Sequence, residues 1–316
     1  MGFFKEATAR VLGSWQGDAD PTLITSQVTR TASLAKTSSY FLQKAGSIDV
    51  AAILADVADA YKISTNPRDY MFIPVRANSV DVPNENGDGF SREETLRFDH
   101  KIGRRVYQTY LLKPHHVNHR ADNPRMARGV IIDVHFNDLN PMPPEWRSRY
   151  EASTGSLIEK DAFVEALLAI DMTKDPFLAN GMKAGAVDSF SMGCECAQTR
   201  CSVCDHIATT RLEFCPHIRY GNKMKWFERP SDRRSIQAFE WCEGVVYSEL
   251  SAVDQPADPR AVKGADLFQL HAALETANGF SRRELMEIAA YAKANDQRLP
   301  ASLRQVIASV LSSSHE

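Results

Sequence analysis

The chain has 316 residues, and its 37 Lys and Arg residues nearly balance its 40 Asp and Glu residues, which gives a formal net charge of -3. This balance argues against a protein that binds nucleic acid, because affinity for phosphates depends on an excess of Lys and Arg. Hydrophobic residues make up 43% and charged residues 24% of the chain, which is typical of a folded protein and excludes disorder over its whole length. The length predicts about two domains, or one large domain with appendages.

No apolar stretch approaches the roughly 20 residues that a membrane-spanning helix needs, since the most notable run is Ala166 to Ile170. The N-terminus, Met1 to Glu6, lacks the apolar segment of a signal peptide, and Glu6 does not fit the myristoylation pattern. We therefore expect no membrane association and a location in the reducing cytoplasm in which the chain is made.

Residues 1–66 are predicted to form a helical arm, because apolar residues recur there at three- and four-residue steps until Asn66-Pro67 ends the pattern. From Tyr70 the sequence changes to short apolar runs typical of strands. The predicted strands are Met71 to Val75, Val106 to Leu112, Gly129 to Phe136, Phe163 to Ile170, Val187 to Met192 and Phe239 to Val253.

Three helix starts are indicated by capping residues. Ser91 with Glu94 and Ser281 with Glu284 form capping boxes, and a further helix is predicted from Asp175-Pro176 to Gly185. After Pro259 the apolar spacing again becomes helical. The sequence thus predicts an α+β protein with a helical arm at 1–66, a β-rich domain at 67–262 and a helical C-terminal module at 263–316.

Five of the six cysteines fall within residues 194–215, and only Cys242 stands apart. In a reducing compartment such crowding predicts metal binding rather than disulfides. The pair in Cys201-Ser202-Val203-Cys204 places two thiolates on one turn, as a tetrahedral zinc ion requires, and Cys215-Pro216-His217 adds two ligands. Because four protein ligands leave no position for water, we predict a structural Zn²⁺ site. Its ligands would be Cys201, Cys204, Cys215 and His217, with Cys194, Cys196 and His206 as alternatives for any one of them.

Two other segments contain residue types that catalysis uses. His115, His116 and His119 lie within five residues of one another, and histidine supplies both general bases and metal ligands. The segment 188–193 places Ser189 and Ser191 before a glycine. Serines before glycines are common in turns, so this second segment alone indicates no activity.

Taken in chain order, these segments resemble the prohead proteases of tailed phages, which mature capsids and share the herpesvirus assemblin fold. The resemblance rests on Asn118-His119 with the strand that follows at Gly129, an apolar strand, a helix, and Phe190-Ser191-Met192-Gly193. The strand at 249–253 and the Asp254-Gln255-Pro256-Ala257-Asp258-Pro259 segment after it resemble the segment that closes the family's domain. The cysteine insert is similar to a variant found in head proteases of large phages.

The resemblance implies a β-rich, assemblin-like barrel and a serine endopeptidase whose nucleophile is Ser191 and whose general base is His119. A serine needs such a base to accept its proton, and the imidazolium that results needs an orienting partner. Asp88 and Asp133 both qualify for this third role. Assemblins use a second histidine instead, for which His217 is a candidate unless it binds zinc, and Ser189 is a rival nucleophile.

The resemblance also implies that the partners are phage capsid and scaffold proteins, that the chain forms a homo-oligomer, and that it acts in the host cytoplasm within the prohead or virion. Two other hypotheses stay open. In the first, the chain is a non-enzymatic virion or assembly protein that keeps the protease fold and a structural zinc. In the second, it is a zinc-dependent hydrolase with His115, His116 or His119 as ligands.

Overall fold

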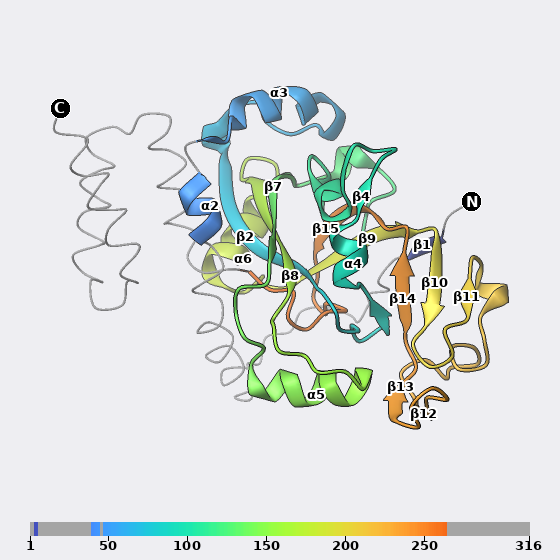
Figure 1. Ribbon diagram of the computed structural model, residues 1–316. Helices are drawn as coiled ribbons and strands as arrows, with labels where there is room; N and C mark the ends of the chain where they lie inside the picture. Colours follow the sequence, from blue (N-terminus) through green and yellow to red (C-terminus); the bar gives the residue numbers. More distant parts are fainter. Residues whose placement is uncertain (1–2, 6–38, 45–46, 264–316) are drawn as a thin grey trace, which may run out of the picture.

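The computed structural model describes residues 3–5, 39–44 and 47–263. The predicted C-terminal module and its capping box at Ser281 therefore lie outside the described residues, as does most of the predicted N-terminal arm. The described part is an α+β fold in which a curled, half-barrel sheet is accompanied by few helices (Figure 1). Over these ranges, no helix is both long enough and apolar enough to cross a membrane.

The central sheet has seven strands in the order β1-β9-β15-β6-β7-β8-β2. Neighbouring strands are antiparallel except β15 and β6, which are parallel. The bounds are Phe3–Lys5 for β1, Tyr70–Ser79 for β2, Pro114–Val117 for β6, Gly129–Asn137 for β7, Phe163–Asp171 for β8, Phe190–Cys196 for β9 and Val246–Ala252 for β15.

The curl of the sheet brings β2 opposite β9, and the segment 261–263 lies between them. Arg76 N donates a hydrogen bond to Val262 O at 3.0 Å, and Phe190 N donates one to Ala261 O at 2.8 Å. Isolated bridges pair Val75 with Lys263 and Ser189 with Val262. This segment therefore fixes the first residues of β9 against the far side of the sheet.

Alternate residues of the strands face two hydrophobic cores, one on each side of the sheet. The inner core lies within the curl and includes Ile73, Leu168, Met192 and Leu250. The outer core lies beneath α2 (Ser39–Lys44) and α3 (Val50–Tyr61) (Figure 1). The buried stripe of α3 packs there against residues of β2, β7 and β8. Residues 50–61 are thus helical and pack directly on the central sheet.

Two predicted helices are confirmed together with their caps. In α4 (Arg92–Leu96), Ser91 Oγ accepts a hydrogen bond from Glu94 N at 3.1 Å. In α6 (Pro176–Ala184), Asp175 Oδ1 accepts one from Leu178 N at 3.0 Å. Gly185 ends α6 with a φ of 74°, a left-handed conformation that glycine adopts without steric cost.

The strand predicted from Val106 to Leu112 was wrong, and the one predicted from Phe239 to Val253 was wrong in part. Residues 106–110 form a 3-10 helix, in which Thr109 Oγ1 donates to Val106 O at 2.7 Å and the Tyr110 ring stacks on Tyr247 at 3.9 Å. The run from Phe239 to Val253 contains two strands, because Gly244 turns the chain with a φ of 64°. The first of the two, β14 (Glu240–Glu243), belongs to a different sheet.

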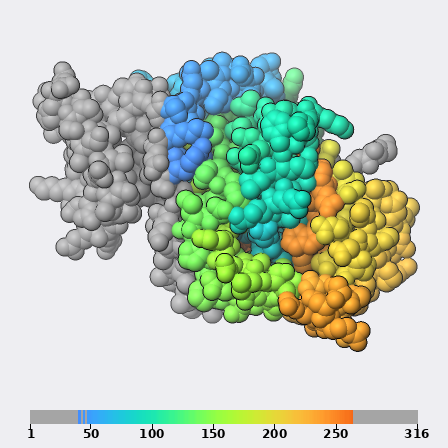
Figure 2. Space-filling model, in the orientation of Figure 1, coloured from blue at the N-terminus to red at the C-terminus, as the bar shows by residue number. Residues whose placement is uncertain are grey.

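That second sheet has the order β11-β10-β14-β3. Its strands are β3 (Asp88–Gly89), β10 (Gln198–Cys201), β11 (Ile207–Ala208) and β14. Smaller pairs join β4 (Phe98–Asp99) to β5 (Arg104–Arg105) and β12 (Trp226–Glu228) to β13 (Ser235–Gln237), and α5 spans Pro144–Thr154. Because β10 follows β9 after one residue, the cysteine-rich segment projects from the serine strand as a lobe, yellow to orange in the space-filling view (Figure 2).

Candidate functional site

The strands β6, β15 and β9 present a set of polar side chains on the face opposite the inner core. Leu250 and Met192 point into that core, so their neighbours Glu249, Ser251 and Ser191 point to the other face. Ser251 pairs directly with Ser191 of β9 and with His116 of β6. Side chains opposite each other on adjacent strands have Cβ atoms about 5 Å apart, so these polar residues are neighbours.

His119 reaches this face through an unusual turn after β6. Asn118 and His119 have φ values of 50° and 54°, which non-glycine residues adopt at a cost in conformational energy. The turn is tied to β15 by two hydrogen bonds, from Asn118 N to Ala252 O at 2.9 Å and from His119 N to Ser251 Oγ at 3.2 Å. Strained backbone of this kind often occurs at functional sites.

The carboxylate of Glu249 lies between the His119 ring and Ser251. Its Oε1 is 2.6 Å from His119 Nδ1, and its Oε2 accepts a hydrogen bond from Ser251 Oγ at 2.5 Å. A carboxylate only accepts hydrogen bonds, so Nδ1 carries the proton of the neutral ring and Nε2 keeps its lone pair. His119 Nε2 is buried and has no hydrogen-bond partner within the described part of the chain. This is the arrangement that a general base requires.

The Oγ atoms of two serines near the Glu249 carboxylate, Ser191 and Ser248, make no hydrogen bond within the described residues. Ser191 is 4% exposed. Ser251 is fully buried and bonded to Glu249, so it supports the carboxylate. Ser189, the rival nucleophile, donates from its Oγ to Asp188 Oδ1 at 3.0 Å.

Gly193 makes room for the Glu249 carboxylate. A Cβ at position 193 would lie 2.7 Å from Glu249 Oε1 and 3.0 Å from its Cγ, which is closer than such atoms approach. The Ser-x-Gly pattern therefore has a steric reason: the residue two positions after Ser191 must lack a side chain because the Glu249 side chain lies against it.

We expect Gly193→Ala to lower the free energy of unfolding by about 1–3 kcal/mol, the usual cost of overpacking. In a Glu249→Ala background the same change should cost less, because the two closest atoms are gone and only Ser248 Oγ, at 3.1 Å, stays near. Chemical denaturation of the four chains measures this coupling. An equal cost in both backgrounds would show that the clash is with something other than Glu249.

Neither aspartate proposed as the third member of the site contacts His119. Asp133 is paired with Lys44 at 3.0 Å, and Asp88 is paired with Lys223 at 2.7 Å. Asp88 does line a small cavity of about 20 Å³ that Ser191 also lines, between β2 and β9. The carboxylate on the His119 ring is Glu249, which was not among the residues predicted from the sequence. Its one signal was the alternation of polar with apolar residues over 249–252, where Glu249 and Ser251 share a face.

The other two histidines of the segment lie on opposite faces of the sheet, and only His116 shares the face of His119. His115 faces the inner core, where its Nδ1 lies 2.7 Å from Leu250 O, and burial lowers its pKa to about 3. His116 is buried on the opposite face beside Ser251, and burial lowers its pKa as well. Because His115 faces the other side from His116 and His119, the three rings do not form one ligand set, and no metal-binding group of the described residues includes them.

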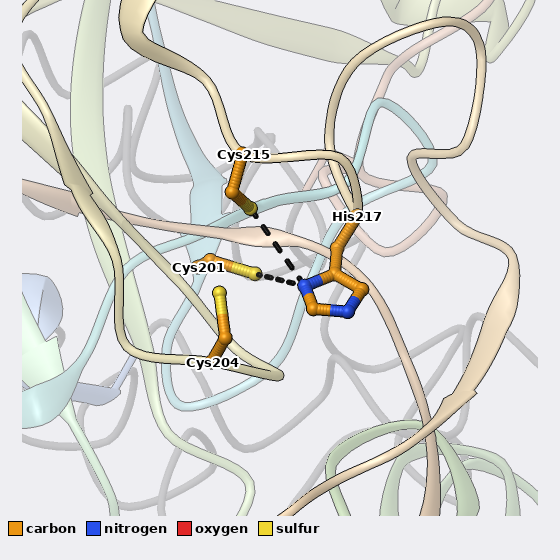
Figure 3. Close-up of side chains that lie close together, drawn as sticks. All are labelled: Cys201, Cys204, Cys215 and His217. Atoms are coloured by element: carbon orange, nitrogen blue, oxygen red, sulfur yellow. Dashed lines mark hydrogen bonds between the residues drawn. The ribbon is translucent and has the colours of Figure 1, made fainter.

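A metal-binding group is present in the cysteine-rich lobe (Figure 3). The ligand atoms of Cys201, Cys204, Cys215 and His217 all lie within 4.8 Å of one another. His217 Nδ1 is 3.9 Å from Cys201 Sγ and 3.8 Å from Cys215 Sγ. Adjacent ligand atoms of a tetrahedral Zn–S/N site are separated by roughly 3.6 Å, so the predicted Cys3His set fits a metal ion.

Backbone hydrogen bonds shape the turns that carry these ligands. Val203 N donates to Cys201 Sγ at 3.4 Å, and Asp205 N donates to Cys201 O at 3.0 Å. Around the group lies a small separate core of Cys201, Val203, Cys215, Ile218, Ile236 and Ala238. Burial raises the pKa of the Cys201 and Cys204 thiols, so metal binding there would have to displace protons.

The three alternative ligands lie elsewhere. Cys194 and Cys196 point from β9 into the inner core, with their Sγ atoms 3.9 Å apart. His206 Nε2 is hydrogen-bonded to Glu213 O at 2.7 Å. Cys194 is therefore outside the four-ligand group, since its strand position directs it away from the lobe.

Comparisons with protein-family models, with curated proteins and with solved structures found no significant match to this chain. Function therefore has to be inferred from the chemistry of the two sites.

Proposed function

We propose that the chain is a serine endopeptidase in which Ser191 is the nucleophile, His119 the general base and Glu249 the orienting carboxylate. One observation carries this proposal: the 2.6 Å contact of Glu249 with His119 Nδ1 leaves Nε2 buried and unpartnered on the face that Ser191 shares. A serine, an imidazole with one free nitrogen and a carboxylate on the other nitrogen are the three parts of a serine hydrolase site.

In this mechanism, Ser191 Oγ attacks the carbonyl carbon of the peptide bond while its proton passes to His119 Nε2. The imidazolium then gives that proton to the leaving amine, and an acyl-enzyme forms. A water molecule then attacks the acyl-enzyme in the same way, with His119 Nε2 accepting its proton, and Ser191 Oγ is released as the leaving group. Glu249 stabilises the imidazolium, and the hydrogen bond from Ser251 to its second oxygen keeps the carboxylate in one orientation.

The resemblance to prohead proteases supports capsid and scaffold proteins as the substrates. On this proposal the chain is a homo-oligomeric maturation protease that acts in the host cytoplasm within the prohead or virion. The cysteine-rich lobe also supports it, because the lobe follows the serine strand directly, where the resemblance places the zinc insert.

We propose that the ion in the lobe is Zn²⁺ and that its role is structural. Three thiolates and one imidazole in tetrahedral spacing suit zinc, and four protein ligands would leave no open position for a reacting water. The ion would hold the lobe beside the strand of Ser191 without taking part in the reaction.

A second candidate function is a non-enzymatic assembly protein with the same fold. The observation in its favour is that His119 Nε2 forms no hydrogen bond with Ser191 Oγ in this structure. Catalytic hydrogen bonds often form only with substrate bound, so the two functions require an experiment to separate them.

The experiment is incubation of the purified chain with tailed-phage capsid and scaffold precursors, followed by mass spectrometry of all fragments, including fragments of the chain itself. The protease proposal predicts defined new termini that appear with the wild-type chain and not with Ser191→Ala. Intact precursors and an intact chain, across several precursors, would favour the assembly protein.

A further inference from the structure

The cysteine-rich lobe differs in charge from the rest of the chain. Within it, residues 198–237 contain eight Lys and Arg but four Asp and Glu, a formal charge of +4 in a chain whose net charge is -3. The balance that argued against binding of nucleic acid is therefore an average over a basic lobe and a more acidic remainder. A basic segment of this kind is typical of a surface that binds a polyanion.

The basic residues of the lobe that lack an acidic partner identify this surface. Five others form ion pairs with carboxylates, namely Arg200, Lys223, Arg229, Arg233 and Arg234. Within the described residues, no ion pair is found for Arg211, Arg219 and Lys225. The residue directly after each of these three is large, apolar and exposed: Leu212 to 84%, Tyr220 to 84% and Trp226 to 52%. An unpaired cation beside an exposed apolar side chain thus occurs three times in one lobe.

Two of these pairs lie on the stretch of turns at 219–226, beside the metal group. The stretch begins with a hydrogen bond of 3.0 Å from the backbone N of its first residue to Cys215 O. The Asn222 side chain connects its far end to the same turn. Asn222 Oδ1 accepts a hydrogen bond from Lys225 Nζ at 3.2 Å, and its Nδ2 donates one to Pro216 O at 2.9 Å. Both cations, each with an aromatic neighbour, are therefore held next to one turn of the metal group.

We propose that Arg219, Tyr220, Lys225 and Trp226, here called the basic-aromatic surface, bind single-stranded nucleic acid. In such a strand phosphates alternate with bases, and the surface twice places an unpaired cation beside an exposed ring. Cations bind phosphates and release counterions, and aromatic rings stack on unpaired bases of any sequence. An acidic peptide would match the cations and leave both rings in water. The proposal depends neither on the protease function nor on the identity of the metal ion.

The first test is a fluorescence anisotropy titration of the full chain with a labelled oligothymidylate of about twelve nucleotides at several salt concentrations. Two phosphate contacts predict that the logarithm of the binding constant falls with that of the salt concentration with a slope of about -1.4. Arg219→Gln/Lys225→Gln should weaken binding about tenfold or more and bring the slope close to zero. Absence of binding, or an unchanged slope in this variant, would overturn the proposal.

The same titration tests the two rings. Tyr220→Ala/Trp226→Ala should weaken binding by about tenfold or more and keep the salt slope, because stacking releases no counterions. Tyr220→Phe/Trp226→Phe keeps both rings and should bind within about threefold of the wild-type chain. Equal affinities of the alanine variant and the wild-type chain would show that no base stacks there and would overturn the proposal.

A remote variant controls for general effects of removing charge and aromatic surface. Phe98→Ala/Lys101→Gln removes an exposed ring and an exposed cation outside the lobe and should bind as the wild-type chain does. Thermal unfolding of every variant checks that the fold is kept. A loss of affinity in this control as large as in the lobe variants would contradict a localised surface.

An acidic peptide decides between two kinds of polyanion. A glutamate peptide with the same number of charges as the strand is titrated in the same way. It should bind about tenfold more weakly than the strand, and Tyr220→Ala/Trp226→Ala should not change its affinity. A peptide that binds as tightly as the strand would assign the surface to an acidic protein segment and overturn the proposal.

Discussion

Replacing Ser191 with Ala is expected to lower the rate of peptide cleavage by about a thousandfold or more while the melting temperature stays close to that of the wild-type chain. Loss of the nucleophile of a serine hydrolase removes the covalent route and leaves only what binding alone contributes. Ser191 forms no side-chain hydrogen bond in the described part of the structure, so its Oγ contributes little to stability. The rate is measured on any substrate found by the fragment mapping.

The same assay tests whether the three residues act as one unit. His119→Ala should cost about as much as Ser191→Ala, and the double variant little more than either, because each single change already disables the proton transfer. Glu249→Gln should also reduce the rate strongly, since an amide can present the wrong hydrogen-bonding partner to Nδ1. Ser148→Ala, on the exposed side of α5, is the control and should cut normally. A rate that survives Ser191→Ala and is lost in Ser189→Ala would move the nucleophile to Ser189.

Loss of a metal ligand is expected to have the largest effect on stability. The core around Cys201, Cys204, Cys215 and His217 contains only six buried residues, too few to hold such a lobe together without a further link. Cys201→Ser or removal of the ion by a chelator should therefore release one metal per chain. The melting temperature should fall by roughly 5–10 °C, as expected for a loss of a few kcal/mol in a chain of this size.

Cys194→Ala is the control for the metal, because it removes a buried cysteine that lies in the inner core and not in the lobe. This chain should keep its metal. Metal analysis by mass spectrometry, together with thermal unfolding, distinguishes the two variants. A chain that contains no metal as purified, or whose unfolding is unchanged by Cys201→Ser, would contradict a structural ion.

The parts of the fold that could be predicted are those encoded by local patterns. Caps at Ser91 and Asp175 located two helices, and apolar runs located β2, β7 and β8. The failure at Val106 to Leu112 has a clear cause. A short run of apolar and aromatic residues suits a strand or a buried helical turn equally well. The stacking of Tyr110 on Tyr247, 137 positions away, cannot be predicted from a short segment of the sequence.

The candidate sites show the same limit. The metal ligands could be predicted because all four lie within 17 residues and their spacing is characteristic. Glu249 could not, because it comes to His119 only through the parallel pairing of β15 with β6, two strands separated by more than a hundred residues. Asp88 and Asp133 were nearer in sequence to the histidine, but each is neutralised by a lysine from another part of the chain.

The most direct test of the central claim is covalent labelling with a fluorophosphonate, which reacts with an activated serine and needs no knowledge of the substrate. Labelled chain is digested and the adduct is located by mass spectrometry. The proposal predicts one adduct per chain, on Ser191, that is lost in His119→Ala. No adduct under conditions that label a known serine hydrolase, or an adduct on another serine, would contradict it.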